Sequence, residues 1–152
     1  MTSPPTDVLA CVDFSPTAAA VVDAAAQLAQ GMQARLHILH AAAPEPEFVG
    51  YDEPGGPEDR DRRADELRDE HARLQELVQR VADDELEVRP LLVMGATVDV
   101  VLAEAERHDS ALIVVGSHGH RALHRVLVGS TTDKLLRRSA RPVVVVPAVD
   151  RT

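Results

Sequence analysis

Five short apolar segments recur along this chain, each separated from the next by enough residues to hold a helix. An apolar run of four to eight residues is typical of a strand that is buried on both faces. Strands joined through helices pair in parallel by right-handed crossovers, and the helices then cover both faces of the sheet. We therefore predict an α/β fold, a three-layer, Rossmann-like sandwich with a five-stranded parallel sheet. Its strands are Val8–Val12, Leu36–Ala41, Val88–Met94, Ala111–Val115 and Val143–Val146.

Capping residues predict where the intervening helices begin and end. A helix is expected from Pro16 to Gln30, because Ser15 is a typical N-cap and Gly31 a typical stop. Thr97 is expected to cap the helix before the fourth strand, and Ser130–Arg138 to form the last helix. One helix therefore follows each of the first, third and fourth strands.

The segment between the second and third strands divides into two parts. Residues Ala42 to Pro57 are rich in proline and glycine, so we expect an irregular and mobile connection there. Residues Glu58 to Val81 are highly charged but carry one semi-apolar stripe at helical spacing, which indicates a helix on the surface. The stripe consists of Leu67, His71, Leu74, Val78 and Val81.

Length and charge limit what such a chain can be. With 152 residues, 45% of them apolar, residues 1–152 are expected to form a single domain. The formal charge of −9 and the scarcity of aromatic residues oppose nucleic-acid binding. No apolar run approaches the roughly 18 residues of a membrane span, and no export signal is evident, so we expect a cytoplasmic protein without a membrane partner.

A glycine motif follows the fourth strand and indicates a phosphate site. Glycine allows backbone amides to approach a ligand closely, and a helix N-terminus offers free N–H groups and the positive end of the helix dipole. The hydroxyl groups that open the last predicted helix can add hydrogen-bond donors. The pattern is Gly116-Ser117-His118-Gly119, nine residues, and then Gly129-Ser130-Thr131.

With this motif and several other segments in matching order, the sequence resembles the universal stress protein family, specifically its ATP-binding branch. The resemblance covers nearly the whole chain and implies an adenine nucleotide alpha-hydrolase-like fold. It implies a stress-response protein with a regulatory function, in which bound ATP alters a surface that partner proteins recognise. The matching segments are Val12-Asp13-Phe14-Ser15, Leu39-His40-Ala41, Met94-Gly95, Val115 to Gly119, Gly129-Ser130 and Arg141-Pro142-Val143.

The resemblance also implies roles for individual residues. The backbone at Val12 and the side chain of Asp13 would lie near the ribose and phosphates, and Ala41 would meet the adenine. Asp13 is also a candidate ligand for Mg²⁺ beside the phosphates. The remaining nucleotide-binding residues implied are Gly116, Ser117, His118, Gly119, His120, Arg121, Gly129, Ser130 and Thr131. The sequence departs from the family at Cys11 and at Arg121, which could clamp a phosphate or crowd the loop.

Structural roles remain open for some of these residues. Asp13 could only begin a turn at Ser15, and Ser130 and Thr131 could be ordinary N-caps. A zinc site at His120 and His124 lacks a completing Cys or Glu nearby. The other histidines, His37, His40, His71 and His108, are expected at the core edge or the surface.

Two alternative functions also remain open. No catalytic constellation is evident, so the enzymatic alternative is at most a slow Mg²⁺-dependent ATPase or an adenylate-processing hydrolase. The other alternative is a nucleotide-free dimeric interaction module. The resemblance implies a homodimer joined through Val143–Val146, whose exposed apolar edge gives a physical reason for pairing.

Overall fold

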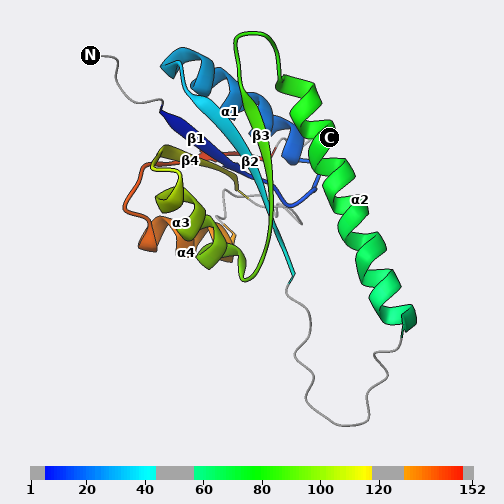
Figure 1. Ribbon diagram of the computed structural model, residues 1–152. Helices are drawn as coiled ribbons and strands as arrows, with labels where there is room; N and C mark the ends of the chain where they lie inside the picture. The colour runs from blue at the N-terminus through cyan, green and yellow to red at the C-terminus, as the bar shows by residue number, and fades with distance from the viewer. Residues whose placement is uncertain (1–5, 44–56, 118–128, 149–152) are drawn as a thin grey trace.

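The computed structural model describes residues 6–43, 57–117 and 129–148 (Figure 1). Five strands and four helices alternate along these parts of the chain, one helix between each strand and the next. The strands are β1 (Asp7–Cys11), β2 (Arg35–Ala42), β3 (Val88–Met94), β4 (Ser110–Gly116) and β5 (Val143–Val146). The helices are α1 (Ala18–Met32), α2 (Pro57–Val81), α3 (Thr97–Arg107) and α4 (Ser130–Arg138).

All five strands pair in parallel in the order β3-β2-β1-β4-β5, which confirms the predicted α/β fold. Helices α1 and α2 cover one face of the sheet, and α3 and α4 cover the other (Figure 1). From β1 the chain first adds strands in one direction, through β2 to β3, and then returns to the other side of β1 for β4 and β5. The strand order therefore reverses between β1 and β4.

Alternation of side chains along each strand divides the interior into two apolar layers. Val8 and Ala10 of β1 pack on the side of α1 and α2, whereas Leu9 packs on the side of α3 and α4. Successive side chains of a strand point to opposite faces, so a strand between two helical layers must be apolar throughout. This requirement explains why the strands were visible in the sequence as continuous apolar runs.

Two predicted boundaries of α1 are wrong. The helix begins at Ala18 with Thr17 at the N-cap, because Ser15 uses its hydroxyl oxygen to accept the Thr17 N–H (3.3 Å) within the preceding turn. It continues through Gly31 to Met32, and Gln33 takes the left-handed conformation that ends it, at φ 55°. The Gln33 N–H reaches the carbonyl of Gln30 (3.2 Å), so a non-glycine residue makes the terminating turn.

Smaller corrections apply elsewhere. Thr97 is the first residue of α3 and Ala96 its N-cap, and Gly129 occupies the N-cap of α4. Ala42 still belongs to β2 and Pro57 already belongs to α2. Between them, Ala43 is irregular as predicted, and residues 44–56 lie outside the described residues.

Helix α2 packs on the surface of the domain through one part of its predicted stripe. Leu74 is fully buried, Val78 and Val81 are partly buried, and His71 is exposed. The stripe therefore contacts the core in the C-terminal half of the helix. None of the helices in the described parts of the chain is long and apolar enough to cross a membrane.

Candidate functional site

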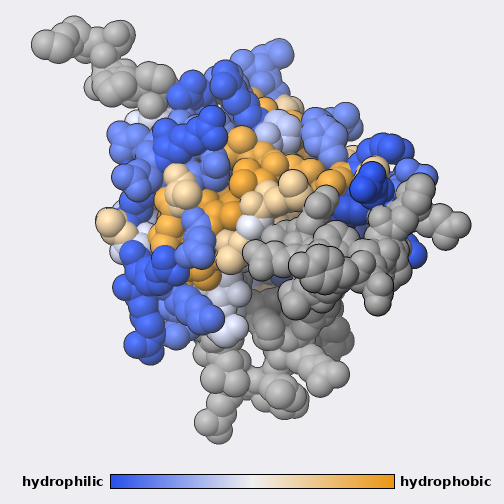
Figure 2. All heavy atoms as spheres, turned by 60° about the horizontal axis from the view of Figure 1, so that its bottom comes forward, coloured by the Kyte–Doolittle hydropathy of each residue, from blue (hydrophilic) through white to orange (hydrophobic). Residues whose placement is uncertain are grey.

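The carboxyl ends of the strands surround a cavity of about 250 Å³. It lies at β1 and β4, where the strand order reverses and the connections leave in opposite directions, which is where open α/β sheets bind ligands. The volume is just below the usual range for small-molecule sites, about 300–1,000 Å³. Figure 2 shows apolar residues gathered in a band across this end of the molecule.

Three helices begin at this cavity. Parallel strands all end on one side of the sheet, so the helices that leave them turn their N-termini to the same place. The first amides of a helix have no intrahelical acceptor, and among the described residues no side chain caps those of α3 or α4 with a hydrogen bond. Free N–H groups and converging helix dipoles favour an anion. The lining residues from these N-termini are Thr17, Ala18, Thr97, Val98, Ser130, Thr131 and Thr132.

Hydrogen bonds hold the start of α4 against the end of β4. The Gly129 N–H donates to the Ser117 carbonyl (2.9 Å), and the Thr132 hydroxyl donates to the Gly116 carbonyl (3.0 Å). Ser117 is nearly buried, and its hydroxyl oxygen accepts the N–H of Ala148 (3.0 Å). Ser117 therefore joins β4 to the segment after β5, a structural role that the sequence did not indicate.

The turn between β1 and α1 forms the opposite wall. Asp13 is exposed, and its Oδ1 accepts the Ser15 N–H (3.0 Å). This bond is the turn considered as the structural alternative for Asp13, and it occupies only one carboxylate oxygen. Phe14 has φ 61°, a left-handed conformation unusual for an aromatic residue. Its ring lies 4.3 Å from that of His40, whose Nδ1 lies 2.9 Å from the Val12 carbonyl oxygen, so the turn is braced against β2.

The interior of the cavity is apolar. Leu39 and Ala41 contribute from β2, Val101 from α3, Val115 from β4 and Leu135 from α4. Among the described residues that line it, Asp13 is the only charged one. The cavity therefore combines an apolar wall, suited to a flat ring, with helix N-termini suited to an anion.

Cys11 also lines the cavity, at the end of β1. Its side chain is only partly shielded from solvent, but the dense protein around the sulfur disfavours the thiolate. This desolvation raises the pKa of the Cys11 thiol from 9.0 to about 12. The thiol is therefore neutral near pH 7 and acts as part of the apolar wall.

Most of the residues singled out in the sequence meet at this cavity. Those that line it are Val12, Asp13, Ala41, Gly116, Ser117, Gly129, Ser130 and Thr131. The predicted loop residues His118, Gly119, His120 and Arg121 lie outside the described residues, as does His124. Gly95, which belongs to one of the segments that resemble the family, does not line the cavity and instead donates its N–H to the Ala42 carbonyl (3.0 Å).

Sequence reasoning missed the part of the wall that comes from α3. Thr97, Val98 and Val101 belong to it. In the sequence, Val98 and Val101 indicate only the inward face of an amphipathic helix. The available signal was topological, since α3 begins at the carboxyl end of β3 and therefore starts at the same edge of the sheet.

Comparisons with known proteins agree with this architecture. The profile of the Universal stress protein family matches residues 6–147. A universal stress protein of Thermus aquaticus is 32% identical over 134 residues, which are 88% of this chain and 90% of that protein. One from Methanocaldococcus jannaschii is 28% identical over 74 residues, and the match spans 49% of this chain and only 46% of that protein.

A solved structure supports the same assignment. The crystal structure of a universal stress protein in complex with cAMP superposes with a TM-score of 0.63 at 28% sequence identity. The alignment covers 95% of this chain and 98% of that one. From the family match across residues 6–147 and these similarities, the chain belongs to the universal stress protein family.

Proposed function

We propose that this chain binds ATP in the cavity between β1 and β4 and acts as a nucleotide-dependent regulatory protein in the stress response. The observation that carries the proposal is the convergence of three helix N-termini on a cavity whose remaining wall is apolar. An adenine nucleotide has the matching chemistry, an apolar ring at one end and phosphates at the other. The related structure in complex with cAMP holds a ligand of this class.

In the proposed complex each part of the nucleotide meets a different part of the site. The phosphates would lie at Gly129, Ser130 and Thr131, where the uncapped amides of α4 begin. The adenine would lie against Ala41 and the neighbouring apolar wall. The ribose would lie near Val12 and Asp13, and Oδ2 of Asp13, which has no hydrogen-bond partner among the described residues, would be available to Mg²⁺. Residues 116–121 would enclose the phosphates.

The test is calorimetric titration of nucleotide-stripped protein with ATP and Mg²⁺. Thr131→Glu places a carboxylate in the exposed first turn of α4, where it favours the helix but repels a phosphate. We expect it to weaken ATP binding at least tenfold, about 1.4 kcal/mol, while adenosine binding is unchanged. Gln27→Glu on the exposed face of α1 adds the same charge away from the cavity and should leave both affinities unchanged.

Absence of binding by the folded parent at millimolar ATP would refute the proposal and favour the nucleotide-free interaction module. Binding that Thr131→Glu does not weaken would place the phosphates elsewhere. Phosphate release by the same preparation tests for the slow ATPase, and its loss in Asp13→Asn would assign the Mg²⁺ ligand. Each result is read on protein whose circular dichroism matches that of the parent.

We also propose that two copies associate through β5. This strand ends the sheet next to β4, and all four of its valines are only partly buried. An edge strand with apolar side chains and unpaired backbone groups is a template for pairing with a second chain. Light scattering should show a dimer, and a monomer at all concentrations tested would contradict this assignment.

A further inference from the structure

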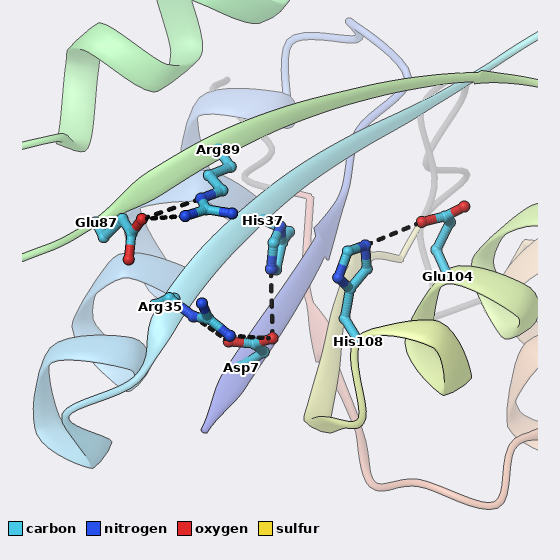
Figure 3. A network of polar contacts seen from close by, with 7 residues as sticks. All are labelled: Asp7, Arg35, His37, Glu87, Arg89, Glu104 and His108. Atoms are coloured by element: carbon cyan, nitrogen blue, oxygen red, sulfur yellow. Dashed lines mark hydrogen bonds and ion pairs between the residues drawn. The ribbon is translucent and has the colours of Figure 1, made fainter. Parts of the chain in front are cut away.

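A second polar cluster lies at the opposite end of the sheet, near the amino ends of the strands (Figure 3). It contains Asp7 at the start of β1, His37 in β2 and His108 directly after α3. A carboxylate oxygen of Asp7 and one ring nitrogen of each histidine lie within 4.8 Å of one another. None of these residues lines the cavity, so the cluster is separate from the proposed nucleotide site.

The hydrogen bonding of His37 is incomplete. Its side chain is 2% exposed, and neither ring nitrogen has a hydrogen-bond partner among the described residues. The Nε2 atom lies 3.4 Å from Oδ2 of Asp7, but not in a direction that makes a hydrogen bond, and the ring stacks on that of His108 at 4.2 Å. Buried polar groups are almost always satisfied, because an unpaired one retains its full cost of desolvation. An additional partner would therefore relieve an unfavourable arrangement.

We propose that Asp7, His37 and His108 form a Zn²⁺ site. Two imidazole nitrogens and one carboxylate oxygen are typical zinc ligands, with bonds of about 2.0–2.2 Å and a tetrahedral arrangement. Atoms bound to one tetrahedral ion at that distance lie roughly 3.4 Å apart. The Asp7 and His37 atoms already have this separation, and all three ligand atoms lie within 4.8 Å of one another. Because the His108 ring stacks on that of His37, it has to turn toward the ion to bind it.

The surroundings contain the outer partners that such a site uses. Arg35 donates from Nε to Oδ1 of Asp7 (2.8 Å), which orients the carboxylate, and from Nη2 to Oδ2 (3.2 Å), an oxygen that it would share with the ion. The Nε2 of His108 lies 3.1 Å from Oε2 of Glu104, which leaves Nδ1 of the same ring for the ion. The side chain of His108 is 23% exposed, so its side of the cluster offers a path to solvent and a position for water as fourth ligand.

The charge at the site also favours a cation. Asp7 and Glu104 are buried, whereas the nearby Arg35 side chain is 32% exposed and Arg107 approaches Glu104 only to 3.8 Å on the surface. Arg35 opposes the ion, but its charge is partly screened by water and shared with Asp7. Burial, and then the proximity of His108, lower the pKa of His37.

The experiment is titration of chelator-treated, tag-free protein with ZnCl₂ against a chromophoric chelator. We expect one Zn²⁺ per chain, with at least tenfold weaker binding in His108→Ala. The exposed residue His71 provides the matched control, and His71→Ala should bind like the parent. At 100 times the dissociation constant, Zn²⁺ should raise the melting temperature of the parent by roughly 5–10 °C.

A measurement on the unmodified protein covers the case in which His108→Ala does not fold. Zn²⁺ should shift the imidazole NMR signals of His37 and His108 and leave that of His71 in place. If the protein takes up no Zn²⁺ below millimolar concentration, the proposal is overturned, and water would then be the only partner left for the ring nitrogens of His37. Uptake that survives in folded His108→Ala, or that disappears instead on replacing His118, His120 and His124, overturns it as well.

Discussion

Replacing Gly95 by alanine is expected to destabilise the protein by about 2–6 kcal/mol, for two separable reasons. Gly95 follows β3 with φ +148°, a conformation that residues with a Cβ rarely adopt and that carries about 1–3 kcal/mol of strain. A Cβ at this position would also lie 2.8 Å from Cγ2 of Val100, a buried residue of α3. Overpacking of this kind costs another 1–3 kcal/mol.

A second glycine provides a control of opposite sign. Gly31 lies inside α1, and a Cβ built there meets nothing within 4 Å. Alanine is better than glycine in a helix interior by about 0.5–1 kcal/mol, so Gly31→Ala should stabilise the protein. The same chemical change therefore raises the free energy of unfolding at Gly31 and lowers it at Gly95.

The assay is urea unfolding followed by circular dichroism, with the free energies extrapolated to water. Adding Val100→Ala to Gly95→Ala removes the atom that clashes, so the two changes together should be less harmful than their sum, while the strain in φ persists. A loss below about 0.5 kcal/mol for Gly95→Ala would refute the reasoning. If the free energy changes of the two single variants add up strictly in the double variant, a clash with Val100 does not contribute to the effect of Gly95→Ala.

Three further predictions concern other parts of the fold. Leu74→Ala should lower the free energy of unfolding by about 2–5 kcal/mol, because Leu74 is fully buried between α2 and the sheet. His71→Ala, at an exposed position of the same helix, should change the free energy of unfolding by less than about 0.5 kcal/mol in the same urea assay. Cys11, with its pKa near 12, should react with iodoacetamide at pH 8 roughly 1,000-fold more slowly than a thiol of pKa 9.0. Bound ATP should slow the alkylation further. Alkylation of Cys11 at the rate of a free thiol would contradict the prediction. The hydrogen bond from Arg80 lowers the pKa of Asp23 below 3.8. The small stabilisation from this pair is therefore present above pH 3.8 and is lost as the pH falls through the lowered pKa. Arg80→Gln should be slightly less stable than the parent at pH 7 and equal to it in strong acid.

The candidate site was predictable in part. The glycines around the β4–α4 connection were found because glycine after an apolar strand indicates a turn that brings backbone amides close together. The bond from Thr132 to the Gly116 carbonyl and the bond from Ala148 to Ser117 were not predictable, because they join residues 16 and 31 positions apart. Side-chain hydrogen bonds over such separations depend on how the elements pack.

Local rules also failed where tertiary contacts took precedence. Ser15 was expected to cap α1, but its carbonyl and hydroxyl oxygens hold the turn that places Asp13 at the cavity, and the helix starts later. Gly31 was expected to end the helix, but the chain turns at Gln33. The Ala34 N–H then donates to the Ala29 carbonyl, and β2 begins at Arg35 beside β1. The position of the next strand therefore decided the end of the helix.

The sequence by itself determined the alternation of strands and helices, their parallel pairing and the edge of the sheet that holds the cavity. These properties follow from apolar runs and the handedness of crossovers, which are local or general constraints. Only the tertiary structure decided that Asp7, His37 and His108 meet at the other end, because no spacing relates residues 30 and 71 positions apart. Their encounter depends on the register of β1 against β2 and on where α3 ends, and both are settled by packing across the sheet.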